Sequence, residues 1–234
     1  MEYILRQKPK NPIIIQGFPS FGLVGTIATG FLIDHLNAKP IGEIVVKEVA
    51  PMLAIHKNTM IKPLEIYYDK KNNIIILNAL MNVNGIEWAI AETILKLADD
   101  LKAKEIITLE GVASQEMTNQ PKAFFYSTKC SEKLKKEGLS ALDEGVILGV
   151  TASLLLKNKN TNISCIFAET HTDLPDSKAA AKAIEVLDKY LGLKVDYKPL
   201  LKKAEEFEGK LKGMMEKGKK SVQLAKEKEV NYMG

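Results

Sequence analysis

Short apolar runs rich in β-branched residues alternate with segments of helical periodicity along most of this chain. The first run, Ile13 to Gln16, precedes a helical pattern from about Leu23 to Leu36, and further strand-like runs cover 41–46 and 52–56. This alternation is typical of α/β proteins, in which helices cover the faces of a sheet. With 234 residues, the chain can form one large domain plus an extension. We therefore predict the α/β fold class.

The middle of the chain contains the most regular patterns. Two β-rich runs flank an Asn-Asn pair, which tolerates positive φ, so residues 64–80 are predicted to form an antiparallel hairpin. Apolar residues at helical spacing predict a helix over 85–101. The apolar runs 105–112 and 163–169 each carry a polar residue near the end, a pattern typical of buried central strands.

Two further helices are expected in the second half of the chain. Residues 143–157 are largely apolar and predict a buried helix. The next helix has an alanine-rich interior, Asp176 or Ser177 as its N-cap, and Gly192 as its stop.

The turn GFPSFGLVG, residues 17–25, joins the first strand to the first helix. A phosphate-binding Walker loop needs Lys and Ser or Thr directly after its last glycine, but two aliphatic residues stand there. The G-x-G spacing of a dinucleotide loop is also missing. We interpret the turn as structural: Gly17 and Pro19 make the bend, and Gly22 and Gly25 let the helix pack close to the sheet. Anion binding at the helix N-terminus is the alternative.

Polar residues near the ends of the two central strands are the candidates for acid–base chemistry. Glu110 lies near the end of the first strand, and Glu169, His171 and Asp173 alternate at and just after the end of the second, where open α/β sheets place ligand-binding groups. A carboxylate beside an imidazole can transfer protons. No nucleophile accompanies them, because Ser114 does not lie in a G-x-S-x-G motif. Polar capping of the loop, or a subunit contact, is the alternative.

The sequence offers little to a metal centre, a disulfide or a nucleic acid. Cys130 and Cys165 lie far apart and outside any CxxC spacing, so we expect reduced thiols, no metal and no cofactor. The net charge of +4 comes from lysines mixed with acids, and aromatic residues make up only 6%, which disfavours nucleic-acid binding. Without a signal-peptide core or a long apolar run, we expect a cytoplasmic protein with no membrane association.

The composition changes near residue 199. From Leu200 to Ala225, apolar and small residues recur at spacings of four and three between charged residues, which predicts a helix that starts at Pro199. We therefore divide the chain into a core domain, 1–198, and a C-terminal helical extension with a tail, 199–234. Several glycines weaken this helix, so it needs a surface to pack on, either its own domain or another chain.

Three sequence blocks occur in the order found in a known family. They are GFPSFGLVG (17–25), LEGVAS (109–114) and a long block from ETHTDLPDSKAAAKAIEV onward (169–208). Together they resemble the proteasome assembly chaperones, in particular their archaeal homologues. The resemblance implies a three-layer α/β/α sandwich related to nucleoside phosphorylases and hydrolases, used as a binding scaffold. It also implies homo-oligomers, a C-terminal helical extension, and the 20S proteasome or its α subunits as the partner.

The resemblance further implies that the C-terminal segment contacts the partner. Some members of the family dock a hydrophobic-Tyr-any-residue tail between α subunits. This sequence ends Val230-Asn231-Tyr232-Met233-Gly234, so its tyrosine is third from the end and follows a polar residue. Val230 and Tyr232 form an imperfect version of the motif. The expected partner-binding residues are Leu200, Phe207, Leu211, Met214, Val230 and Tyr232.

Two classes of function follow from the sequence. The first is a non-catalytic, oligomeric chaperone that assists 20S proteasome assembly, and a scaffold for some other partner is its variant. The rival is a phosphorylase- or hydrolase-like enzyme on a small molecule, with 17–25 as an anion loop and Glu110, Glu169 and His171 as acid–base groups. The rival lacks phosphate-binding arginines, because Arg6 is the only arginine in the sequence.

Overall fold

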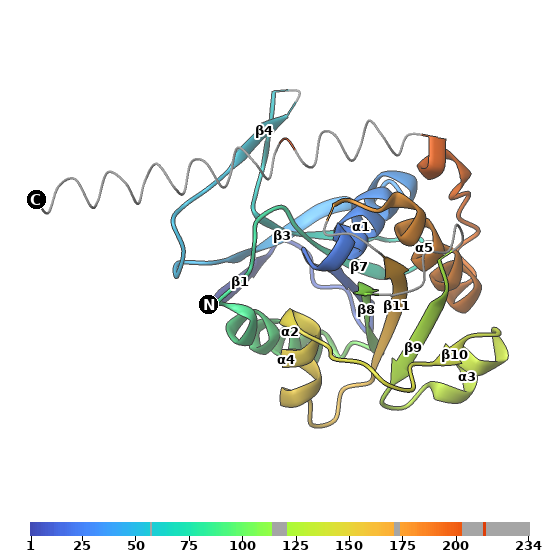
Figure 1. The fold of residues 1–234 in the computed structure, drawn as a ribbon. Helices are drawn as coiled ribbons and strands as arrows, with labels where there is room; N and C mark the ends of the chain where they lie inside the picture. Colours follow the sequence, from blue (N-terminus) through green and yellow to red (C-terminus); the bar gives the residue numbers. More distant parts are fainter. Residues whose placement is uncertain (57, 114–120, 171–173, 203–212, 214–234) are drawn as a thin grey trace, which may run out of the picture.

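The structure is a computed structural model that describes residues 1–56, 58–113, 121–170, 174–202 and 213. A nine-stranded mixed sheet forms its centre, in the order β1-β3-β6-β7-β2-β8-β11-β9-β10 (Figure 1). The strands are β1 (Glu2–Leu5), β2 (Ile13–Gly17), β3 (Lys39–Val45), β6 (Leu64–Asp69), β7 (Ile74–Ala79), β8 (Glu105–Ala113), β9 (Ala123–Ser127), β10 (Ser140–Ala141) and β11 (Ile163–Thr170). The helices are α1 (Val24–His35), α2 (Glu87–Leu101), α3 (Ser131–Lys136), α4 (Gly149–Lys157) and α5 (Ser177–Leu191), with a 3-10 turn, η1, at Phe21–Leu23. The predicted α/β class is confirmed.

The four central strands, β7, β2, β8 and β11, run parallel to one another. They are buried on both faces, which explains their nearly continuous apolar sequences. The predictions of buried strands at 105–112 and 163–169 are confirmed. Strands β6 and β7 form the predicted antiparallel hairpin, with Asn73 at a φ of +56° in its turn.

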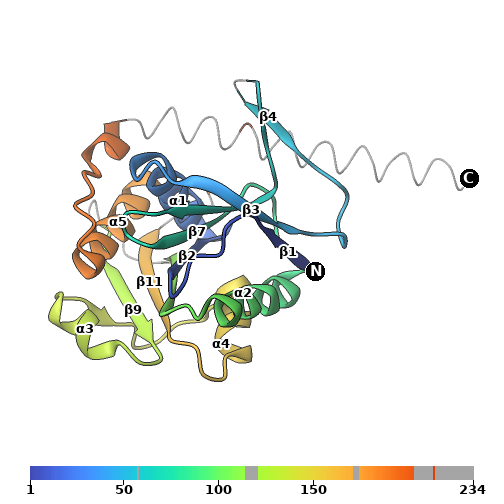
Figure 2. The ribbon, with the colours of Figure 1, turned by 180° about the vertical axis from the view of Figure 1, so that it is seen from behind.

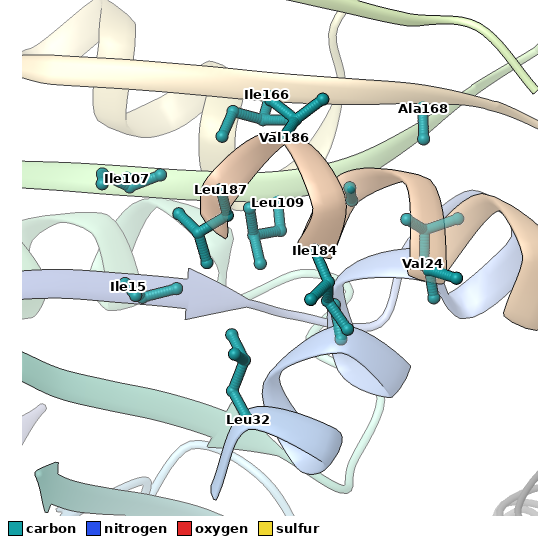
Figure 3. Close-up of a cluster of buried hydrophobic side chains, with 14 of the residues drawn as sticks. Ile15, Val24, Leu32, Ile107, Leu109, Ile166, Ala168, Ile184, Val186 and Leu187 are labelled. Atoms are coloured by element: carbon teal, nitrogen blue, oxygen red, sulfur yellow. The ribbon is translucent and has the colours of Figure 1, made fainter. Parts of the chain in front are cut away.

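Helices cover both faces of the sheet. On one face, α1 and α5 pack against the strands, and Figure 3 shows Leu32 of α1 and Leu187 of α5 beside Ile15 and Ile107 of the sheet. On the other face, α2 and α4 close a second apolar cluster. The two clusters alternate along each strand because successive side chains point to opposite faces. The core therefore consists of two apolar layers separated by the sheet.

Helix α5 begins and ends as the sequence predicts. The carboxylate of Asp176 accepts a hydrogen bond from the backbone N–H of Ala179 at 2.9 Å, which makes Asp176 the N-cap. Gly192 follows the helix at a φ of +69°, the left-handed conformation that glycine adopts at low cost.

The prediction of one buried helix over 143–157 is wrong in two respects. Helix α4 covers only its second half, because Leu148 is extended and Gly149 has a φ of +70°. In addition, α4 buries only its inner face, and Leu148 and Leu156 are exposed on the outside.

A hairpin arm extends away from the body of the molecule. Strands β4 (Ala54–His56) and β5 (Thr59–Ile61) pair only with each other, as a separate two-stranded sheet among the described residues. Figure 2 shows this pair at the top, beyond the main sheet. We call residues 53–61 the β4–β5 arm.

The first residues of the predicted C-terminal extension pack on the core. Leu200 is only 3% exposed and belongs, with Val195, to the cluster between the sheet and the helices α1 and α5. The predicted seam residues Phe207, Leu211 and Met214 lie outside the described residues, as do Val230 and Tyr232. The boundary between 198 and 199 stays a prediction, although the core contacts reach at least to Leu200.

Candidate functional site

The glycines of the turn at 17–25 allow α1 to lie directly on the backbone of two central strands. A Cβ atom added at Gly25 would lie 2.1 Å from the carbonyl oxygen of Leu109 in β8. One added at Gly17 would lie 2.0 Å from the carbonyl oxygen of Gly25. Both distances are far below any real contact, so neither position accommodates a side chain. Pro19 is half-buried in the same turn.

The second half of this turn is tied to the start of α5. Gly22 has a φ of +62°, and its carbonyl oxygen accepts a hydrogen bond from the N–H of Asp176 at 2.9 Å. The hydroxyl of Thr170, at the end of β11, donates to the Asp176 carboxylate at 2.8 Å. The next residue, Leu23, also has a positive φ, +50°, which is uncommon for a residue with a side chain. These contacts give the turn a structural role, joining the ends of β2 and β11 to two helices.

Glu110 belongs to a chain of buried polar side chains between the sheet and α4. The hydroxyl of Thr151 in α4 hydrogen-bonds to the Glu110 carboxyl at 2.5 Å, and the amide of Gln16 donates to that hydroxyl at 2.9 Å. The other amide atom, Oε1 of Gln16, has no hydrogen-bond partner in the described part of the chain. Gln16 and Glu110 were visible in the sequence as polar residues inside apolar strands, but nothing in it linked them to Thr151.

The surroundings of Glu110 favour its protonated form. Burial raises the pKa of this carboxyl from 4.5 to about 7, and the hydrogen bond from Thr151 offsets only part of that increase. Burial likewise raises the pKa of the Cys165 thiol to about 12, so this cysteine is neutral. A pKa near neutrality is common for catalytic acids, but Glu110 is only 6% exposed.

The raised pKa predicts that folding stability falls as the pH increases. Between pH 4.5 and about 7, Glu110 ionises in the unfolded chain but holds its proton in the folded one, so the folded state loses stability across this range. The variant Glu110→Gln keeps an acceptor for Thr151 and cannot ionise. Relative to this variant, we expect the wild type to lose about 2 kcal/mol of unfolding free energy between about pH 5 and pH 8, measured by urea denaturation.

The variant Glu132→Gln, at an exposed carboxylate of α3, is the control for the removal of one acidic side chain. Glu105 also has a pKa raised by burial, but its contribution is present in both the wild type and Glu110→Gln and cancels in the comparison. Parallel pH profiles of the wild type and Glu110→Gln would show that the pKa of Glu110 is not raised by folding.

The second group of candidate acid–base residues is not assembled by the described residues. Glu169 lies near the end of β11, and its carboxylate accepts a hydrogen bond from the backbone N–H of Lys122 at 3.0 Å. It is thus one of the groups that hold the chain next to β9. His171 and Asp173 lie outside the described residues.

Comparison with known proteins shows to which family the chain belongs. The model of the PAC2 family matches residues 14–215, a range that contains all of β2 except Ile13, every later strand of the described residues, and helices α1 to α5. The chain belongs to the PAC2 family. The matched range includes the turn at 17–25, Glu110 and the start of α5.

Two solved structures from Pyrococcus furiosus are similar to this one in fold and in sequence. PbaA of Pyrococcus furiosus, an archaeal homolog of proteasome-assembly chaperone, is 32% identical with a TM-score of 0.84, over 94% of this chain and 98% of that one. PbaB of the same organism, an archaeal proteasome activator, is 25% identical with a TM-score of 0.75, over 90% of this chain and 97% of that one. An uncharacterized protein of Methanocaldococcus jannaschii is 30% identical over 96% of this chain and 94% of its own length. The resemblance to archaeal homologues of proteasome assembly chaperones is confirmed.

This PAC2 protein also has a groove of about 1110 Å³ between α5 and the strands β9 and β10. Lysines and acids both line it, and Lys182 and Lys189 form ion pairs with Glu185 at 3.1 and 2.7 Å. Tyr197 and Leu201, which lead into the C-terminal segment, form part of its wall. The groove is distant from Glu110 in the fold, on the other face of the sheet.

Metal and membrane features are absent from the part of this PAC2 protein that the structure describes. Within those residues, no three His, Cys, Asp or Glu side chains are grouped so that they could hold a metal ion. None of the helices placed there combines the length and the apolar character needed to cross a membrane.

Proposed function

We propose that this PAC2 protein is a non-catalytic chaperone that binds the 20S proteasome, or its α subunits, and assists proteasome assembly. In this proposal it acts as a homo-oligomer in the cytoplasm, and its core is a three-layer scaffold of the nucleoside phosphorylase type. The observation that carries the proposal is the likeness to PbaA, which extends over 94% of this chain and 98% of that one.

The candidate catalytic groups support a scaffold better than an enzyme. The Glu110 carboxyl is enclosed between β8 and α4, and the Glu169 carboxylate binds a backbone N–H. The only arginine of the sequence, Arg6, donates to the carbonyl oxygen of Pro40 at 2.8 Å. A phosphorylase-like enzyme needs accessible acid–base groups and cations that hold phosphate. These three contacts therefore favour the chaperone over its rival.

The partner-binding elements are assigned to the C-terminal segment. Leu200 is buried in the core, so it anchors this segment to the domain. The apolar residues that follow in the sequence supply the contacts with the proteasome in this proposal. They are Phe207, Leu211, Met214, Val230 and Tyr232.

A pull-down with the full chain tests this function. We expect the tagged protein to recover proteasome α subunits from native lysate, identified by mass spectrometry, and to bind purified α subunits in a direct titration. The tag alone is the control. If neither assay detects a proteasome subunit, the proposal is wrong. Micromolar binding of a nucleoside or ATP in a calorimetric titration would favour the enzyme instead.

A further inference from the structure

The first turn of α4 is attached to the sheet by a chain of buried polar side chains. Thr151 of this turn hydrogen-bonds to the Glu110 carboxyl of β8 at 2.5 Å and accepts a hydrogen bond from the Gln16 amide of β2 at 2.9 Å. The rest of the inner face of α4 is apolar, and Val150 and Leu154 pack in the same cluster as α2. Two hydrogen bonds thus join the start of α4 to two central strands.

The Glu110 carboxyl has few groups that could stabilise a negative charge. Among the described residues, its one hydrogen-bond donor is Thr151, whereas an ionised carboxylate has about four acceptor sites. The neighbouring elements turn uncharged side chains toward this side of the sheet. They are Gln16 of β2, Leu77 of β7, Ile90 and Ile94 of α2, Val150 and Leu154 of α4, and Cys165 and Phe167 of β11.

Cys165 is the titratable member of this set, and burial, with a smaller contribution from Glu110, raises the pKa of its thiol to about 12. The thiol is therefore neutral and supplies no charge to balance a carboxylate. A buried carboxylate without a cation or further donors is costly, so the enclosed site favours the protonated form of Glu110.

A second acceptor in this cluster lacks a partner. Oε1 of Gln16 is buried and has no hydrogen-bond partner in the described part of the chain, although Nε2 of the same amide donates to Thr151. A buried acceptor without a partner costs free energy. Water entering beneath α4 would donate both to this oxygen and to an ionised Glu110. Both polar groups therefore gain hydrogen bonds when the start of α4 moves away.

Among the elements around Glu110, α4 is the one that can move. Strand β8 is paired with β2 on one side and β11 on the other, so it is fixed. Helix α4 has only nine residues, no side chain caps its N-terminus, and Gly149 at a φ of +70° provides a hinge before Thr151. Leu148 and Leu156 are 75% and 72% exposed, so the described chain leaves the outer side of α4 uncovered.

The other end of α4 has an attachment of its own. Lys157, the last residue of the helix, forms an ion pair with Glu92 of α2, and its ammonium lies 5.4 Å from the centre of the Trp88 ring. Figures 1 and 2 both show α4 beside α2, on the outside of the sheet. The first turn of α4 can therefore leave the sheet while the last turn stays on α2.

We propose that loss of the proton from Glu110 releases the first turn of α4 from the sheet. In the closed state, protonated Glu110 bonds to Thr151, and Val150 is buried. In the open state, the carboxylate and Gln16 are hydrated, and the start of α4 is accessible. This pH-dependent opening goes beyond the proposed function, because it is a property of the isolated chain.

The sign and size of the effect follow from the two states of Glu110. Burial raises the pKa of this carboxyl from 4.5 to about 7 in the closed state, and hydration returns it toward 4.5 in the open state. The open state loses its proton at lower pH, so increasing pH favours opening. Between pH 5 and pH 8, these two pKa values give an increase of about 70-fold in the equilibrium constant for opening.

Hydrogen exchange of single α4 amides, followed by NMR, measures this equilibrium. Glu110→Gln cannot ionise, so comparison with it at each pH removes the chemical pH dependence of exchange. Relative to this variant, we expect the protection of α4 amides in the wild type to fall by about 70-fold between pH 5 and pH 8. Ser153→Ala is the matched control and should behave as the wild type, because Ser153 hydrogen-bonds to the Gly149 carbonyl oxygen of its own helix at 3.1 Å.

Thr151→Val tests the contact from the side of the helix. The hydrogen bond from Thr151 lowers the pKa of Glu110, so its removal should raise that pKa further. We therefore expect a larger fall in α4 protection between pH 5 and pH 8 than in the wild type. The double variant Thr151→Val with Glu110→Gln should lose this pH dependence, and its persistence there would show that another group drives the opening.

The amides of β8 distinguish local opening from global unfolding, because β8 is a central strand. At pH 8 we expect α4 amides of the wild type to be less protected than those of β8. Equal protection of α4 and β8 at pH 8 overturns the proposal, and so does α4 protection that follows Glu110→Gln at every pH. The experiment uses the protein alone, so its failure is distinct from a failure to bind proteasome subunits.

Discussion

Replacing Gly25 with alanine is expected to cost more than about 4 kcal/mol of folding free energy, or to prevent folding altogether. The new methyl group would lie 2.1 Å from the carbonyl oxygen of Leu109 and 2.9 Å from the Cα of Gly17. Both neighbours are backbone atoms of central strands, which are held by hydrogen bonds on both sides and cannot move aside. Helix α1 would have to lift from the sheet, which opens the cluster around Ile15 and Leu109.

Alanine substitutions at two other glycines give losses of folding free energy with which the Gly25→Ala loss can be compared. Gly192→Ala places a methyl group in open space at a φ of +69°, so we expect a cost of only about 1 kcal/mol. Gly22→Ala should fall between them, because its methyl group meets only side-chain atoms, those of Thr170, although their displacement also disturbs the hydrogen bond from Thr170 to Asp176. Urea denaturation of the three variants measures how much unfolding free energy each one loses and therefore ranks them. If Gly25→Ala costs no more than Gly192→Ala, the close approach of α1 to β8 is not what constrains this position.

Local patterns predicted much of the fold because local physics determines it. The parallel strands are recognisable from their uninterrupted apolar runs, and α5 from its Asp176 cap and Gly192 stop. The β6–β7 hairpin follows from a turn in which Asn73 adopts a positive φ. In each case the residues that determine the element are neighbours in the sequence.

Features that depend on distant residues were not predictable in the same way. Helix α4 appeared to be buried because its sequence is apolar, but burial depends on what lies against its outer face. Gln16 and Thr151, which are 135 residues apart, meet only because the sheet brings β2 under α4. The sequence likewise suggested Glu110 as an acid–base group, whereas its enclosure and raised pKa depend on packing around it.

The second large expected effect is a loss of proteasome binding when the C-terminal segment after Lys202 is removed. We expect a truncation after Lys202 to reduce binding to proteasome α subunits by at least about a hundredfold, or roughly 2.7 kcal/mol. The cut is placed after Lys202 because Leu200 is buried among core residues, and a deletion starting there would also destabilise the domain. The truncated protein should therefore unfold at the same temperature as the full chain, which is the control for this variant.

Two full-length variants show which residues of the C-terminal segment contribute most to binding of the proteasome. Phe207, Leu211 and Met214 offer more apolar surface than Val230 and Tyr232, and apolar anchors carry most of the free energy of a typical interface. Changing these three residues to alanine should therefore reproduce most of the loss, while Tyr232→Ala should weaken binding by about tenfold or less, on the order of 1.4 kcal/mol. Affinities measured against assembled 20S particles decide the ranking, and loss of all binding in Tyr232→Ala would make the tyrosine the principal anchor.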